Sequence, residues 1–523
     1  MHRRAVLLNG LALGGTAVAS AVLGGTASAA TAVAATASAD LSGTGPYGSL
    51  EGRSPDGNGL VLPEGFSSRI VAVGGAVVGA TDYSWPLFPD GKGTIATPDG
   101  GWILACNHEV FDFQTIGESA GGASSIRFDS GGSILDAYPI LEGSHSNSRG
   151  AITPWGTWLS CQEAHQGDGR IWECDPTGDR PAVPRDALGV RTHGSVAVDR
   201  VGGHCYLTEA HRDGRLYRFT MLDESASGAA LADGPLEVMA VDPDGGVSWI
   251  PVPDLSGGVA PTRVQAENGF VTPVGGGVWV HDGSLLFTTG LDDRVHAVDL
   301  AEQRHSLVWD GSGHRQPLVG IGDLTVAPVS GDLFVAEDRG DMELVLISTE
   351  GLVAPFCRMV GDDHRLSAVT GPCFDPSGTR LYVSSLRGRG EALVRDVVEA
   401  IDWGHGVEGR HVGVTYEVSG PFRSGSLADH SSGSTTTVQP LAATVPASGT
   451  GTTTVPATDP PADGLSPSSP PATTLQLAAE SATGSGGGDS GAGGSRLGIG
   501  AVAVLALGAG VVALRRRGSD GPA

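Results

Sequence analysis

The chain has 523 residues, a formal net charge of −26 and 82 glycines. So acidic a chain lacks the basic patches that bind phosphate backbones, which excludes nucleic acid as a partner. Abundant glycine and little long helical periodicity favour many short strands joined by tight turns, an all-β architecture.

The N-terminus has the layout of an export signal. Arg3 and Arg4 precede an apolar run, and Ala/Ser-rich cleavage sites follow it as far as Ala29 or Ala39. The paired arginines are typical of a twin-arginine signal, although an ordinary secretory signal has the same layout. We therefore expect residues 1–39 to be a signal and 40–58 a linker, with the folded part exported.

One sequence motif recurs along the middle of the chain. It consists of a Gly/Asp/Pro turn followed by an alternating apolar strand that ends in a few polar residues, its polar tip. Its six copies span residues 97–106, 153–161, 198–208, 281–289, 327–336 and 374–384. A spacing of about 45 to 55 residues, with one wider gap, is the period of a propeller blade. The sequence thus predicts a six-bladed β-propeller over residues 59–423, with polar tips converging around one axis.

The two ends of this domain indicate how the ring closes. Residues 59–74 contain an alternating strand that opens the domain, and residues 413–418 form a late strand. Pairing of the late strand with the opening one would remove exposed sheet edges, the main stabilising device of a closed ring.

The C-terminal part predicts a tether. Residues 424–496 are rich in Ser, Thr, Pro and Gly with almost no large apolar side chains, a composition typical of a disordered stalk. Residues 497–514 are apolar and just long enough for a single transmembrane helix. Three arginines open the tail at 515–523, which marks it as cytoplasmic. We expect a monomer held at the outer face of the plasma membrane.

The six cysteines are Cys106, Cys161, Cys174, Cys205, Cys357 and Cys373. None shows the Cys-x-x-Cys spacing of a metal site. Cys161 and Cys174 could face each other across neighbouring strands and form a disulfide, which export would favour. The alternative is that the cysteines are small buried hydrophobic residues.

Several motifs in order resemble the PhoX-type alkaline phosphatases and their shorter relatives. They lie at residues 106–109 (CNHE), 153–163 (TPWGTWLSCQE), 172–178 (WECDPTG), 334–338 (FVAED), 371–378 (GPCFDPSG) and 413–422 (GVTYEVSGPF). Their joint occurrence is more specific than any one alone. The resemblance implies twin-arginine export, a six-bladed propeller, hydrolysis of phosphomonoesters and some diesters, and an iron and calcium cluster at the axis.

The resemblance also implies a set of metal ligands on this chain. The matching or surviving acidic and amide side chains are Asn107, Glu109, Glu163, Glu209, Asp323 and Glu337. Asp338 also survives beside a strand end. The alternative for Glu209, Glu337 and Asp338 is that they are polar caps and ion-pair partners.

At four other positions the family's expected ligands are replaced, by Ser148, Gly194, Gly276 and Gly322. Glycine offers no ligand atom, and a serine hydroxyl is a poor substitute for the thiolate that holds iron. An intact iron–calcium cluster is therefore not expected, whereas one calcium ion remains compatible with the surviving carboxylates.

Two functions follow as hypotheses. In the first, the chain is a metal-dependent phosphatase with a reduced, calcium-containing site. Arg149 and Arg191 would then bind the phosphate of a phosphoester substrate, with Arg339 and Arg387 also near strand tips. In the second, it is a non-catalytic surface propeller that kept the scaffold and binds an unknown surface ligand. Both require acidic side chains from separate blades to meet, and neither assigns a catalytic residue.

Overall fold

The computed structural model describes residues 44–110, 121–164, 168–222, 228–312, 317–361, 364, 367–388 and 412–423. The expected signal, stalk, anchor and tail lie outside these residues. Within the described ranges, no helix is both long enough and apolar enough to span a membrane.

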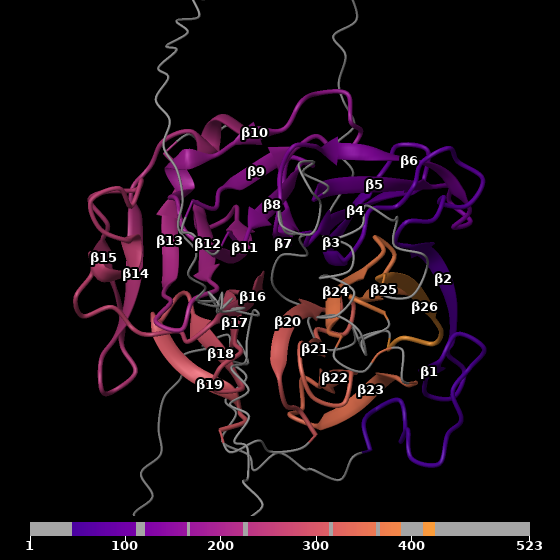
Figure 1. Ribbon diagram of the computed structural model, residues 1–523. Coiled ribbons are helices and arrows are strands. Elements are labelled where there is room, and N and C mark those ends of the chain that lie inside the picture. The colour runs from indigo at the N-terminus through magenta and orange to yellow at the C-terminus, as the bar shows by residue number, and fades with distance from the viewer. Residues whose placement is uncertain are drawn as a thin grey trace, which may run out of the picture. The chain divides into compact units, whose positions relative to one another are not determined.

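The described strands form six antiparallel sheets. Their innermost strands contact one another in a closed ring, which confirms the six-bladed propeller (Figure 1). From the axis outward, the first three blades are β3 (Pro89–Ala96), β4 (Trp102–His108), β5 (Gly122–Phe128), β6 (Ile134–Leu141); β7 (Asn147–Ile152), β8 (Trp158–Gln162), β9 (Ile171–Cys174), β10 (Val183–Pro184); and β11 (His193–Asp199), β12 (His204–Glu209), β13 (Leu216–Thr220), β14 (Leu236–Val241), β15 (Val247–Pro251).

The other three blades complete the ring, and two of them take their outermost strand from the N-terminal part of the chain. They are β16 (Gly275–His281), β17 (Ser284–Thr289), β18 (Arg294–Asp299), β19 (Arg304–Asp310); β20 (Ile321–Val326), β21 (Leu333–Glu337), β22 (Glu343–Ile347), β23 (Val353–Met359), β1 (Leu60–Val61); and β24 (Val369–Phe374), β25 (Arg380–Ser385), β26 (Val414–Ser419), β2 (Ser67–Val73). Among the described residues, the helices are short 3-10 turns at Asp186–Leu188, Gly228–Leu231 and Thr262–Val264.

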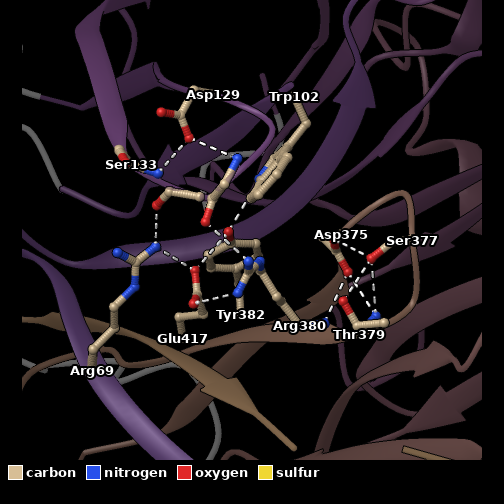
Figure 2. A network of polar contacts seen from close by, with 12 residues as sticks. Arg69, Trp102, Asp129, Ser133, Asp375, Ser377, Thr379, Arg380, Tyr382 and Glu417 are labelled. Atoms are coloured by element: carbon tan, nitrogen blue, oxygen red, sulfur yellow. Dashed lines mark hydrogen bonds and ion pairs between the residues drawn. The ribbon is translucent and has the colours of Figure 1, made fainter. Parts of the chain in front are cut away.

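The recurring sequence motif corresponds to the turn between the first and second strands of each blade, together with the second strand. Acidic side chains hold such turns by accepting backbone N–H groups. Asp375 does so in the turn before β25, where it binds the N–H groups of Thr379 and Arg380, and Asp129 binds those of Gly131 and Ser133 in the same way in the turn between β5 and β6 (Figure 2). A short side chain that replaces a backbone acceptor explains why Asp and Gly recur at these positions.

The ring closes where the chain enters and leaves the propeller, as the sequence predicts. Strand β2 pairs with β26 from Ser67 opposite Ser419 to Val73 opposite Val414. Beyond these strands, Tyr47 packs edge-on against Phe422, and its hydroxyl accepts the backbone N–H of Arg423. Contacts from both flanks thus hold the closing pair.

A buried carboxylate fastens this closure to the first blade. Glu417 on β26 accepts hydrogen bonds from Arg69 at 2.7 Å, Tyr382 at 2.9 Å and Arg380 at 3.4 Å (Figure 2). The two arginines also donate to the carbonyls of Gly131 and Gly132, in the β5–β6 turn. We call Glu417 and these partners the closure clasp.

Every inner strand carries a bulge at the same place in its register, where two residues face one on the second strand. A bulge re-aims side chains and ends regular pairing. The bulged pairs are Asp90–Gly91, Ser148–Arg149, Gly194–Ser195, Gly276–Gly277, Gly322–Asp323 and Gly371–Pro372. Each blade therefore presents an irregular pair of residues at the same end of the propeller axis.

The disulfide considered from the sequence does not form. All six cysteines are free and buried. Cys161 lies opposite Ile171, and Cys174 lies opposite Trp158, so the two thiols sit at different levels of the same sheet. Burial also raises the pKa of the Cys106 thiol to about 12. The cysteines act as small core residues.

Candidate functional site

Charged side chains from four blades gather around the propeller axis, at the end where the inner strands carry their bulges. Asp90, Arg149 and Asp323 come from the bulges of β3, β7 and β20. Glu109, Glu163 and Asp338 follow the ends of the second strands β4, β8 and β21 and hold the same register position there. Lys92 and Arg387 complete the group. We call these eight residues the axis cluster.

The guanidinium of Arg149 occupies the middle of the axis cluster. Its Nη1 lies 3.7 Å from Glu163 Oε2, and its Nε lies 3.9 Å from Asp323 Oδ1. Asp90, Asp323, Glu163 and Asp338 together raise the pKa of Arg149. The ion-pair distances exceed those of strong charge-assisted hydrogen bonds, so Arg149 neutralises several carboxylates without binding any one tightly.

The other two cations hold single carboxylate-bearing residues. Arg387 donates to Glu109 at 3.0 Å. The ammonium of Lys92 donates to the backbone carbonyl of Asp90 at 2.5 Å. Burial raises the pKa of the Asp90 carboxyl, although the charges of Arg149 and Lys92 act against that shift. Asp90 is only 2 % exposed, and its Oδ1 has no hydrogen-bond partner. A buried charged oxygen without a donor is costly.

Four carboxyl groups of the axis cluster, those of Asp90, Glu109, Glu163 and Asp323, have a pKa above its usual range. Burial is the main cause, and neighbouring carboxylates add to it. The pKa is raised to about 8 for Glu109, about 7 for Glu163 and about 6 for Asp323. When all groups are ionised, five carboxylates face three cations, which leaves a surplus of two negative charges.

A sequence model described as "Alkaline phosphatase PhoX" matches residues 116–277. A search of curated proteins finds no match. Among solved structures, the chain is similar to Pseudomonas fluorescens PhoX in complex with vanadate, at 14% identity and a TM-score of 0.55, covering 69% of this chain and 96% of that one. The gluconolactonase XC5397 from Xanthomonas campestris gives 11% identity and a TM-score of 0.37, covering 64% of this chain and 86% of that one. The predicted resemblance to the PhoX family is confirmed.

Three of the six ligands implied by the PhoX resemblance, Glu109, Glu163 and Asp323, meet in the axis cluster. Asn107 does not offer a free oxygen to it. Its amide donates to the carbonyls of Ser148 and Arg149, and its oxygen accepts the indole N–H of Trp158. Asn107 therefore braces the first blade against the second.

Glu209 and Glu337 stand one register position earlier than Glu109 and Glu163, which turns them away from the axis. Glu209 accepts hydrogen bonds from Tyr217 and Arg263. Glu337 accepts three backbone N–H groups, from Val319, Asp341 and Glu343. Both carboxylates therefore have hydrogen-bond partners within the fold.

The two arginines expected to bind phosphate have different surroundings. Arg149 lies in the axis cluster. Arg191 instead stacks on Tyr217, with its guanidinium carbon 3.8 Å from the ring centroid, inside the apolar core between the second and third blades.

The glycines at expected PhoX ligand positions fall on the bulges, and two of them leave no room for a side chain. A Cβ on Gly194 would lie 2.2 Å from the carbonyl oxygen of Gly275, and one on Gly276 would lie 2.2 Å from that of Gly322. Real Cβ atoms do not approach backbone oxygen so closely. Gly322 differs, since its Cβ would point at Asp338 and Arg149.

The iron–calcium cluster that the PhoX resemblance implies does not fit the side chains present at the expected ligand positions. Ser148 stands where the resemblance expects the cysteine thiolate that binds iron. At Gly194 and Gly276 the neighbouring backbone leaves no space for a carboxylate side chain. In the part of the chain that the structure describes, no three His, Cys, Asp or Glu side chains are arranged to hold a metal ion. Arg149 stands among the carboxylates that come nearest to doing so.

The sequence reasoning missed Asp90 and Lys92. Both lie on β3, an inner strand whose residues Pro89–Ala96 are rich in glycine and lack the alternation that marked the second strands. A usable signal was present: in five of the six inner strands a glycine lies at the bulge, and only in the first blade does an aspartate precede that glycine.

Proposed function

We propose that the axis cluster binds one divalent cation, calcium, and that the propeller hydrolyses phosphoesters at this place. The PhoX-like sequence and fold support the reaction class. The observation that carries the proposal is the surplus of buried carboxylates, which includes the unpartnered Oδ1 of Asp90. A divalent cation would balance the two excess negative charges.

The donors suit calcium in kind. Calcium prefers several carboxylate and carbonyl oxygens and tolerates irregular geometry. Asp90, Glu163 and Asp323 would hold it, with their carboxylates released from Arg149. A bound cation of this type neutralises phosphate charge and polarises the phosphorus–oxygen bond.

The chain's own cations would then orient the substrate. Once a cation neutralises the carboxylates, Arg149 is free to donate its paired N–H groups to phosphate oxygens, the geometry at which guanidinium excels. We propose that this happens outside the cell, on a monomer tethered by residues 497–514.

The test combines calorimetry and an assay on the full chain after chelation. Calcium is expected to bind with a stoichiometry near one and to restore nitrophenol release from nitrophenyl phosphate. The double variant Asp90→Asn with Glu163→Gln should lose both. The control Asp299→Asn removes one carboxylate far from the axis while its turn contacts to Ala301 and Glu302 remain possible. A wild-type protein that binds no calcium and releases no nitrophenol would overturn the proposal.

A second candidate is a non-catalytic binding propeller. The position of Arg149 favours it, because this cation already partly neutralises the carboxylates that a metal would need. Calcium binding without hydrolysis of any phosphoester tested would select this alternative over the phosphatase. Hydrolysis unaffected by Asp90→Asn with Glu163→Gln would instead contradict the assignment of the reaction to the axis cluster.

A further inference from the structure

The most anomalous charged group outside the axis cluster is Arg191. Its side chain is 2 % exposed, and none of its three guanidinium nitrogens has a hydrogen-bond partner. The guanidinium lies over the ring of Tyr217 and packs against Gly189. A Cβ atom on Gly189 would lie only 2.3 Å from Arg191 Nη1, so the glycine makes room for the guanidinium. An arginine stays charged in proteins, and a buried charge without partners costs several kcal/mol.

The charges around Arg191 do not balance. Among the residues that the structure describes, Glu209 is the one carboxylate whose charge acts on Arg191. That carboxylate is already bound on both oxygens, by Arg263 at 2.9 Å and by the hydroxyl of Tyr217 at 2.8 Å. Two arginines therefore share one glutamate, which leaves one positive charge inside the core between the second and third blades.

We infer that a small monovalent anion, chloride, binds the guanidinium of Arg191 between the second and third blades. The N–H groups of Arg191 would donate to it, and its single charge would cancel the excess. A phosphate dianion would overcompensate, and the wall beside the guanidinium, formed by Tyr217 and Leu236, is apolar. Water could bridge from Arg191 to the unpartnered Nδ1 of His193 but would leave the charge uncompensated.

This site is separate from the proposed cation site. Arg149 of the axis cluster interacts with four carboxylates, whereas Arg191 interacts with one that other groups already hold. Chloride binding is therefore expected to stabilise the propeller equally in calcium-free and calcium-loaded protein, and failure of either proposal leaves the other intact.

Bromide serves as the probe because it replaces chloride and scatters anomalously. Crystals of the full chain grown in bromide should show an anomalous peak beside the Arg191 guanidinium. In solution, replacing sodium gluconate by sodium chloride at constant ionic strength should raise the melting temperature by ~2 °C, as expected for a ligand well above its dissociation constant.

The matched variants are Arg191→Met and Arg218→Met. Arg218 also stacks on an aromatic ring, that of Trp249, but its charge is paired with Glu237. The chloride effect should vanish in Arg191→Met and persist in Arg218→Met. Water alone beside Arg191 in the bromide crystals, a phosphate there, or an unchanged chloride effect in Arg191→Met would overturn the inference. If Arg191→Met does not fold, the bromide crystals decide.

Discussion

The closure clasp and the axis cluster are both groups of buried charges that join separate blades, yet they differ in balance. In the clasp, one carboxylate meets two arginines and a tyrosine hydroxyl, and its oxygens are satisfied. In the axis cluster, five carboxylates share three cations, and Asp90 keeps an oxygen without a partner. A satisfied network stabilises the ring, whereas an unsatisfied one indicates that something else binds.

The largest expected effect is a loss of stability on substitution of Gly276, which lies at the bulge of β16. Gly276→Glu should destabilise the protein by about 4 kcal/mol, because its Cβ would lie 2.2 Å from the carbonyl oxygen of Gly322. Urea unfolding measures the loss, and Gly57→Glu, which meets nothing within 4 Å, is the control. A normally stable Gly276→Glu protein with increased metal content would show that the axis does accept the ligand of PhoX.

The second effect concerns the clasp. Glu417→Ala should cost about 3 kcal/mol, because it leaves the buried hydroxyl of Tyr382 and two arginines without their common acceptor. The control is Glu350→Ala, since Glu350 pairs with Arg423 at the surface and is 57% exposed; it should cost less than about 1 kcal/mol. Equal losses in the two variants would remove the distinction between the clasp and an ordinary surface ion pair.

The smallest expected effect is a pH dependence of stability that distinguishes the axis cluster from the closure clasp. Carboxyl groups with a raised pKa in the folded state, such as Glu163 at about 7 and Glu109 at about 8, bind protons that the unfolded chain has released. Their contribution to stability is complete below pH 4.5 and is lost as pH rises through these values. In chelator, stability should therefore fall by up to about 1 kcal/mol per pH unit between about pH 7.5 and 8.5.

Buried histidines give the opposite sign at lower pH. Burial lowers the pKa of His108 to about 3, so its contribution is present above pH 6.5 and lost as the solution becomes more acidic. Unfolded histidines still bind protons near pH 6.5, so the carboxylates are isolated only above about pH 7.5. Saturating calcium should flatten the slope there, while the clasp variant Glu417→Ala should keep it. Melting curves with no slope in chelator would contradict the charge surplus.

The sequence was sufficient for the fold because each blade repeats a turn and an alternating strand, and both are local patterns. It was less informative about the site. A bulge inserts one residue into each inner strand, and adjacent residues on a strand point to opposite faces. Hence Asp338 reaches the axis while Glu337 binds backbone N–H groups, and Glu163 reaches it while Glu209 pairs with Arg263. Such a shift of one position depends on pairing between distant strands.

Tyr47 and Arg423 are neighbours, so the polypeptide enters and leaves the ring at a single point of its rim. Force applied through either flank is received there first, by the aromatic rings around Phe422 and by the pairing of β2 with β26. The inner strands, which carry Asp90 and Arg149, belong to other blades and bear none of this load directly. The pairing of β2 with β26 can therefore take up such a load while the axis cluster keeps its geometry.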